Sequence, residues 1–402
     1  MKFRAVLSMV LACGCFLTSP VGAAAPTTTD LFDRGTVQEI RIFMNSRDLQ
    51  QLRERFREDV YYVADFQWGN IRVRNAAVRS RGGGSRNAEK PGLRVDFNRY
   101  ATGQRFLGLK SLVLDNLLQH GSMVAESTAM AFFERMGQPA PRESFCRLYI
   151  NGVFHGLYAL VESVDSEFLS RSLGESAGYL FSYQSQGPFY GEYLGDELAA
   201  YKRLFEPQNH ELESDAILYS PIRDLFREVN QPEDAVWRDR VEQYVDLRQF
   251  VTHVAIETFL AEYDGILGVS SMNNFYLYRS GNTSQHRLIV WDKDRTFVEP
   301  GFPIFWGADE NVIFRRAIGY RDLLELYLEV LEQCALAAAD EDWLEKEIVR
   351  AATLVAPHVR EDRRKLFSNE EFEGSVILLR EFARARPSFV LGELRKVRTG
   401  SR

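Results

Sequence analysis

The sequence predicts an α+β protein with a strand-rich first part and a mainly helical second part. Between residue 37 and about residue 164, short apolar stretches with alternating polarity are separated by turn dipeptides, which is typical of strands. From residue 165 to 397, apolar residues recur mostly at helical spacing. The chain has 402 residues, of which 45% are hydrophobic, so it can bury a large core as one domain or two lobes.

The first 25 residues are expected to be a secretory signal peptide. Lys2 and Arg4 precede an apolar run at 5–17, and small residues follow at 19–25. Cys13 and Cys15 leave a lipoprotein signal open beside ordinary cleavage. The apolar run is too short to span a bilayer, and residues 26–36 are expected to form a polar leader. Removing the signal takes the formal net charge from −7 to −9, because two basic residues and no acidic residue are lost.

Composition argues against two classes of partner. The chain is acidic and has no basic tract, which disfavours nucleic acid as the main partner. No later apolar run approaches the roughly 20 residues of a membrane span, so we expect an exported protein without a transmembrane anchor, in the periplasm, outside the cell or on its surface. Cys146 and Cys334 remain after cleavage and fit either one disulfide or two separate buried thiols; neither has zinc-site spacing.

The strand-rich part contains two turn signals of hairpins, Gly69-Asn70 and Asn151-Gly152. The expected strands are 37–44, 62–68, 71–81, 93–97, 111–115, 145–150 and 153–161, with helices at 46–57 and 122–136.

A glycine-rich turn at residues 81–86 joins two of these strands. Glycines let backbone N–H groups approach an anion, and Arg81, Lys90 and Arg94 would add positive charge to a phosphate site. A flexible hairpin loop is the alternative interpretation. Glu162 closes the last strand, either at a solvent-facing edge or inside a cleft where it meets a lysine or a nucleotide.

The second part begins with a short helix at 166–173, a strand at 179–183 and an insert of uncertain structure at 184–193. Further helices are expected at 195–205, 215–230, 232–244, 247–263, 321–338, 341–355 and 371–397. His253, on the helix at 247–263, is interpreted as a core or groove histidine and not as a metal ligand.

An acidic hairpin at residues 264–297 carries most of the hard oxygen donors and is expected between or beneath the two parts. Strands at 275–279 and 288–291 would place Asn274 beside Asp292 and Asp294 at one edge, with Asp264 nearby. Magnesium is commonly held by one or two carboxylates together with phosphate oxygens and waters. The combination predicts a divalent-cation site, whereas a D-x-D sequence alone also fits a solvated turn.

Three blocks of sequence occur in a fixed order and, with the helical C-terminal part, span most of the chain after the signal peptide. They are Arg81-Gly82-Gly83-Gly84-Ser85-Arg86 through Lys90, Arg94 and Phe97; residues 149–158 (YINGVFHGLY) through Glu162; and Asp264 through Asn274-Phe275-Tyr276 to Trp291-Asp292-Lys293-Asp294. This ordered set resembles the spore coat protein H (CotH) kinase family, whose members are secreted, atypical relatives of protein kinases.

The resemblance implies a two-lobed atypical protein-kinase-like fold, with a sheet-rich N-lobe at about 37–164 and a helical C-lobe at about 165–397. It implies transfer of a phosphoryl group from ATP, with Mg²⁺ or Mn²⁺, to a hydroxyl group, Ser or Thr, of an unidentified secreted or envelope protein. The implied roles are Asp264 as the catalytic acid that positions the acceptor hydroxyl; Asp292 as the metal ligand, assisted by Asn274 and Asp294; Arg81, Ser85, Lys90 and Arg94 along the phosphates; and Glu162 facing the nucleotide or a basic partner.

Three departures from the family pattern concern residues expected to contact the nucleotide. Gly83-Gly84 replaces polar Asn/Ser residues, Lys90-Pro91 replaces a lysine pair, and Arg94 stands for a lysine.

Two other classes of function stay open. One is a non-catalytic envelope or surface binding module on the same fold, and the other is a metal-dependent nucleotidyl or glycosyl transferase, which a D-x-D sequence serves equally well.

Overall fold

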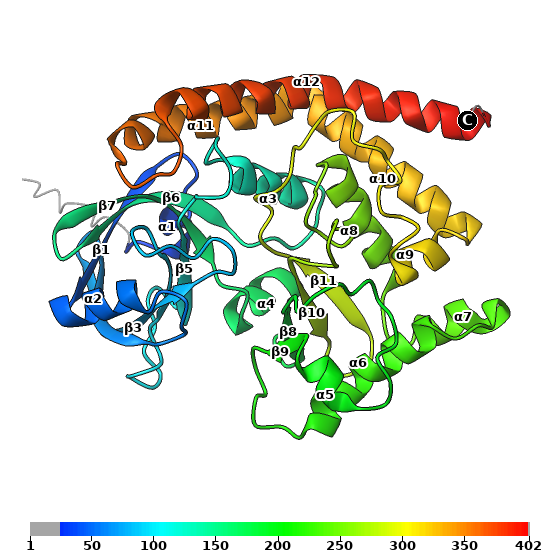
Figure 1. The fold of residues 1–402 in the computed structure, drawn as a ribbon, viewed down its shortest axis with the longest axis horizontal. Helices are drawn as coiled ribbons and strands as arrows, with labels where there is room; N and C mark the ends of the chain where they lie inside the picture. The colour runs from blue at the N-terminus through cyan, green and yellow to red at the C-terminus, as the bar shows by residue number, and fades with distance from the viewer. Residues whose placement is uncertain (1–24, 401–402) are drawn as a thin grey trace, which may run out of the picture.

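Seven strands of the first part close into a barrel (Figure 1). The computed structural model describes residues 25–400. The expected signal peptide, whether it is of the ordinary or the lipoprotein type, lies outside the described residues except for Ala25. The barrel order is β1-β2-β3-β4-β5-β7-β6, and a parallel pairing of β6 with β1 closes it. The strands are β1 (Val37–Met44), β2 (Tyr62–Trp68), β3 (Ile71–Arg81), β4 (Gly92–Asp96), β5 (Ser111–Asp115), β6 (Glu143–Ile150) and β7 (Val153–Glu162).

Alternating burial along the strands fills the barrel with apolar side chains. Phe66 meets Phe97 and Phe106 at ring-centroid distances of 5.1 and 4.9 Å in edge-to-face geometry. The predicted Asn-Gly turn is confirmed, since Asn151 and Gly152 both take positive φ angles, which suits a tight hairpin between β6 and β7. The strands of the first part therefore follow the sequence pattern closely.

The polar leader contains a short helix, α1 (Thr28–Leu31). Thr27 and Asp30 form a reciprocal capping box that fixes its first turn. Leu31 and Phe32 are buried in the core of the barrel. The leader therefore packs onto the barrel, which its polar composition did not predict.

A second, four-stranded sheet has the order β11-β10-β8-β9. Its strands are β8 (Tyr179–Tyr183), β9 (Phe205–Pro207), β10 (Phe275–Arg279) and β11 (His286–Val290). Strands β10 and β11 form the predicted antiparallel hairpin, and Phe275 pairs with Val290 at the end where both strands meet the acidic residues. The segment expected as one helix at 195–205 instead divides into α5 (Leu198–Lys202) and β9, because Phe205 to Pro207 pair with β8.

Helices surround this sheet and extend over the barrel. Figure 1 shows α11 and α12 running along one side of the molecule, above both the barrel and the helical part. The helices are α2 (Ser46–Glu54), α3 (Ala125–Arg135), α4 (Ser166–Leu173), α6 (Asp215–Val229), α7 (Asp234–Val241), α8 (Leu247–Phe259), α9 (Val312–Ala317), α10 (Arg321–Ala339), α11 (Trp343–Glu361) and α12 (Asn369–Thr399). The mixed α+β class predicted from sequence is confirmed.

Two findings bear on earlier expectations. Cys146 and Cys334 are separate, buried thiols and do not form a disulfide with each other. Among residues 25–400, none of the helices combines the length and apolarity needed to cross a bilayer.

Candidate active cleft

A polar cleft of about 740 Å³ lies between the barrel and the second sheet. Its barrel wall consists of the ends of β3 and β4 and the glycine-rich turn between them, including Arg81, Ser85 and Arg94. Its hairpin wall consists of the residues around the start of β10 and the end of β11, including Asp264 and Asp292. The structure thus brings together residues from two of the sequence blocks that are about 180 positions apart.

The hairpin wall holds Asp264 and Asn274 against each other. The side-chain amide nitrogen of Asn274 donates to the carboxylate of Asp264 at 3.2 Å and to its backbone oxygen at 3.1 Å. Asn273 donates to the same carboxylate oxygen at 3.2 Å. Because the amide nitrogen of Asn274 is engaged, its side-chain carbonyl oxygen remains available as an acceptor or metal ligand.

Asp292 and Asp294 follow β11 but do not continue it. The strand ends at Val290, and Asp292 has φ of +50°. The positions of the two acids are therefore not set by strand geometry, which the sequence pattern had suggested. Burial, followed by repulsion from neighbouring acids, raises the pKa of Asp294 well above its ordinary value. Burial also raises the pKa of Asp292, although Arg81 opposes the shift. The two carboxylates therefore lie close enough to repel each other.

Asp294 is incompletely satisfied. Its Oδ2 accepts a hydrogen bond from Gln119, whereas its buried Oδ1 has no partner among the described residues. Neither Asp292 nor Asp294 forms an ion pair within the described part of the chain, which leaves both available to a cation.

Lys293, between these two acids, points the other way. It is fully buried and pairs with Glu257 of α8 at 2.7 Å, and it donates to the backbone oxygen of Asn274 at 3.0 Å. Glu257 also contacts Nε2 of His253 at 3.1 Å, which confirms His253 as a satisfied core histidine. This ion pair fixes the hairpin on α8, and of the two acids beside Lys293 it is Asp292 that lines the cleft.

The barrel wall is positively charged. Arg81 pairs with Asp115 at 3.1 Å and lies 5.5 Å from the ring centroid of Trp291. Burial disfavours its charge, but Asp115 and Asp292 outweigh this and raise the pKa of Arg81. Arg94 forms a long hydrogen bond to Ser111, at 3.4 Å, and its buried Nε has no partner in the described structure. Both guanidinium groups are suited to an anion in the cleft.

The glycine-rich turn is tightly constructed at its first position. Gly82 has φ of +112°, and a Cβ there would lie 2.5 Å from the Oγ of Ser85. Glycine is therefore required at 82, and Ser85 lies directly against the turn. Gly83 and Gly84 are exposed and line the cleft, so their backbone N–H groups are accessible.

Two residues expected at the nucleotide do not line the cleft. Lys90 is fully buried and pairs with Asp362, after α11, at 2.8 Å. Glu162 is also buried and receives hydrogen bonds from Arg142 at 2.7 Å and Arg171 at 2.6 Å. Both side chains thus form ion pairs within the protein, and neither lines the cleft.

Sequence reasoning missed three acids near the cleft, Asp115, Glu126 and Glu143. Burial and then repulsion from Glu143 raise the pKa of Glu126 well above its ordinary value, and burial and then Asp115 raise the pKa of Glu143 to about 8. The sequence did contain an indication for Asp115, because this acid ends an apolar strand in the same way as Glu162 does. The two glutamates stand at or near the start of their helix and strand, next to other polar residues, and the sequence contained no comparable indication for them.

The donors fit a cation that completes its shell with phosphate and water. Within residues 25–400, no three His, Cys, Asp or Glu side chains are grouped to hold a metal by themselves. Asp292, the free Oδ1 of Asp294 and the carbonyl oxygen of Asn274 supply hard oxygen donors. Burial and, after it, neighbouring acids raise the pKa of both carboxylates, and a bound divalent ion would favour their charged form.

One sequence string, Gly174 to Gly178 (GESAG), matches the nucleophile motif of serine hydrolases. It follows helix α4 and precedes strand β8, which is the reverse of the strand, turn and helix that such a nucleophile requires. The fold therefore does not place Ser176 in the strand-turn-helix geometry of a hydrolase nucleophile.

Comparison with known proteins agrees with the sequence blocks. A family model described as CotH kinase protein matches residues 78–390. The chain is 21% identical over 362 residues to the inner spore coat protein H of Bacillus subtilis (strain 168), covering 88% of this chain and 96% of that relative. A crystal structure of the Helicobacter pylori proinflammatory kinase CtkA aligns with a TM-score of 0.30 and 10% identity, over 76% of this chain and 94% of that one. The match to the family model covers more than half of the sequence, and the chain belongs to the CotH kinase family.

Proposed function

We propose that this protein is a metal-dependent protein kinase that transfers the γ-phosphoryl group of ATP to a serine or threonine hydroxyl of an exported or surface protein. In this proposal, the barrel is the N-lobe of a two-lobed kinase-like fold, at about 37–164, and the helical part is the C-lobe. The family membership, the expected signal peptide and the similarity to the inner spore coat protein H support the proposal.

The observation that carries the proposal is the composition of the cleft. One wall offers guanidinium groups and exposed glycine N–H groups, and the facing wall offers unpaired carboxylates and an amide. Phosphoryl transfer requires charge neutralisation and positioning more than covalent chemistry, so these opposed walls suit a triphosphate with its cation.

Individual roles follow from the contacts. Asp264 is held by the amides of Asn273 and Asn274 and lines the cleft, so it is placed to accept a hydrogen bond from the acceptor hydroxyl and orient it. Asp292, Asp294 and Asn274 would hold Mg²⁺ or Mn²⁺, which when bound neutralises phosphate charge. Arg81, Arg94 and the turn at Gly83 and Gly84 would contact the phosphates, with Ser85 beside them.

Lys90 and Glu162 have no contact with phosphate in this proposal, because each is buried with a protein partner. Arg81 is instead the basic residue of the barrel wall that acts on Asp292, where it opposes the rise in pKa that burial causes. Its neighbours Asp115, Asp292 and Glu126 all act to keep it charged.

Product analysis tests the proposal directly. The full-length protein is incubated with Mg²⁺ or Mn²⁺ and ATP labelled at either the α- or the γ-phosphate, together with candidate exported proteins and a casein-type generic acceptor. Transfer of the γ-label alone, as phosphoserine or phosphothreonine, is the expected result. Transfer of the α-label would establish a nucleotidyl transferase instead. Binding of nucleotide without transfer to any protein, including the enzyme itself, would favour the non-catalytic module.

A further inference from the structure

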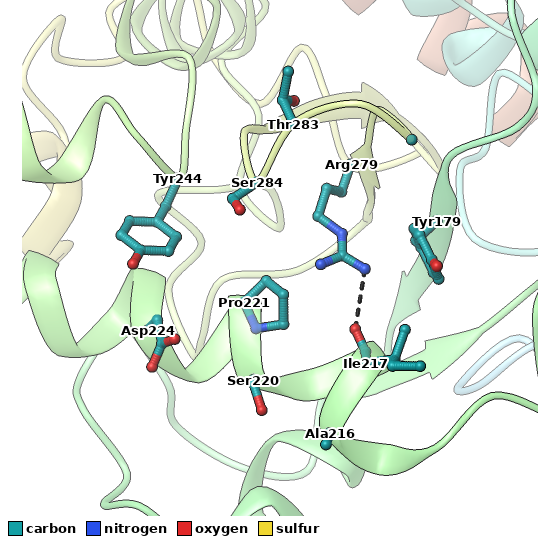
Figure 2. A pocket seen from close by; sticks show the side chains of 11 residues that line it. Tyr179, Ala216, Ile217, Ser220, Pro221, Asp224, Tyr244, Arg279, Thr283 and Ser284 are labelled. Atoms are coloured by element: carbon teal, nitrogen blue, oxygen red, sulfur yellow. Dashed lines mark hydrogen bonds between the residues drawn. The ribbon is translucent and has the colours of Figure 1, made fainter.

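A second pocket, of about 390 Å³, lies at the opposite end of strand β10 from Asn274 (Figure 2). Helix α6 forms one side, and the turn between β10 and β11 forms the other. A strand of five residues spans roughly 17 Å, so this pocket is separate from the cleft. Arg279, at the end of β10, is its central charged residue.

One N–H group of Arg279 stabilises helix α6. Its guanidinium donates to the backbone oxygen of Ile217 at 3.1 Å. Helix α6 contains Pro221, which has no N–H with which to bond that oxygen four residues earlier. Arg279 thus replaces a hydrogen bond that proline removes, and its guanidinium lies 4.1 Å from the ring centroid of Tyr179.

The rest of the guanidinium has no partner that accounts for its charge. Arg279 is only 7% exposed, yet within the described structure its side chain forms no ion pair and no hydrogen bond other than that to Ile217. The acid in this pocket, Asp224, is already engaged by Arg223 at 2.8 Å and Arg227 at 3.0 Å. Burial accordingly lowers the pKa of Arg279, in the absence of a counter-charge that would offset it.

A buried cation without a counter-ion is costly to maintain, and a pocket beside it can admit the missing anion. Figure 2 shows the guanidinium between Ser284 and Tyr179, next to Pro221, with the hydroxyl side of Ser284 toward the pocket. A guanidinium carries five donors in a planar fork that matches a phosphate or carboxylate group. The pocket therefore offers a charged fork and a neighbouring hydroxyl donor.

We propose that this pocket is a binding site for a compact oxyanion of the phosphate class, with Arg279 as the charged contact and Ser284 as a hydrogen-bond donor. The phosphate group arrives either as free phosphate or as the monoester of a phosphorylated serine. The site is independent of the proposed transfer reaction, because it shares no lining residue with the cleft.

Hydrogen exchange can localise the binding, which matters because the arginines of the cleft also attract phosphate. Exchange of the full-length protein is measured against increasing inorganic phosphate and, separately, O-phosphoserine. We expect saturable protection in peptides covering residues 215–221 and 279–286. A half-maximal concentration at least tenfold lower for O-phosphoserine assigns the ester as the source, and the reverse order assigns free phosphate.

The variant Ser284→Glu supplies a carboxylate to Arg279 from the exposed turn, and Ser284→Gln is its uncharged match in size. Both keep Arg279 and its bond to helix α6, so both are expected to fold. Ser284→Glu should raise the half-maximal concentration at least tenfold more than Ser284→Gln does, because both variants lose the serine hydroxyl and only the first adds a carboxylate beside Arg279. Protection confined to residues 81–94, or equal protection in the two variants, would overturn the proposal.

Discussion

The charged residues on the two sides of the cleft differ in whether the protein supplies them with ion-pair partners. On the hairpin wall, Asp292 and Asp294 have no ion-pair partner in the described structure, and their pKa values are raised. Behind the barrel wall, Lys90 and Glu162 are each neutralised by residues of the protein itself. All four belong to the sequence blocks that carry the family resemblance. Lys90 and Glu162, buried with their partners, therefore hold the fold, whereas Asp292 and Asp294, which lack such partners, are available for chemistry.

Asp264→Asn should give the largest change in activity on the hairpin wall. Loss of the carboxylate that orients the acceptor hydroxyl is expected to reduce transfer by about 10²- to 10⁴-fold. The affinity for nucleotide and metal should stay within threefold, because the amides of Asn273 and Asn274 still fix this segment. Transfer assays and nucleotide titrations measure the two effects separately. Full activity in this variant would remove Asp264 from the mechanism.

Lys90→Met should give the largest change in stability on the barrel side. It leaves Asp362 buried without its counter-ion, which is expected to cost about 3–5 kcal/mol in the free energy of unfolding. Denaturant unfolding measures this loss. The double variant Lys90→Met with Asp362→Asn should recover part of it, because the uncompensated charge is removed. A stable Lys90→Met protein with weakened nucleotide binding would instead place Lys90 at the phosphates.

Glu162→Gln should have a smaller effect of the same kind. The variant loses the charge that Arg142 and Arg171 share, but both arginines remain partly exposed to water. We expect a loss of about 1–3 kcal/mol of unfolding free energy and an unchanged KM for ATP. A raised KM with unchanged stability would show that Glu162 serves the nucleotide after all.

The buried pair Glu126 and Glu143 should make stability depend on pH in an unusual direction. The folded-state pKa of Glu143, about 8, lies above its unfolded value of about 4.3, so the folded protein binds the extra proton between these values. Stability should therefore fall as pH rises from 5 to 8, by at most about 1.4 kcal/mol per pH unit for this group. Thermal unfolding of Glu143→Gln should show a shallower slope, whereas the exposed control Glu89→Gln should keep the parent slope.

Much of the fold follows from local pattern. The limits of β1, β2, β3, β5 and β8 agree with the sequence prediction, because alternation and turn dipeptides are local signals. The edge that unites Asn274 with Asp292 was also predictable, since the pairing of two strands across one turn fixes which ends meet. The division of residues 195–205 between α5 and β9 was not predictable, because β9 is a strand of only three residues that is defined by its pairing with β8.

The partners of charged residues were the least predictable part of the site. Lys90 and Asp362 are 272 positions apart, and nothing local in either segment indicates the other. Arg279 shows the same limitation, since its link to Ile217 depends on how α6 packs beside β10. A sequence pattern identifies residues capable of chemistry, but tertiary packing decides which of them are neutralised.

The most direct test of the contrast between the walls is thermal unfolding with and without ATP and Mg²⁺ or Mn²⁺, for the parent protein and for Asp292→Asn. At about 100 times its dissociation constant, a ligand should add roughly 2.7 kcal/mol to stability. We predict a stabilisation that requires nucleotide and metal together and is lost in Asp292→Asn, whose unliganded fold remains intact. An equal stabilisation of the variant, or none in a well-folded parent protein, would contradict the assignment of the unpaired carboxylates to a nucleotide-bound metal.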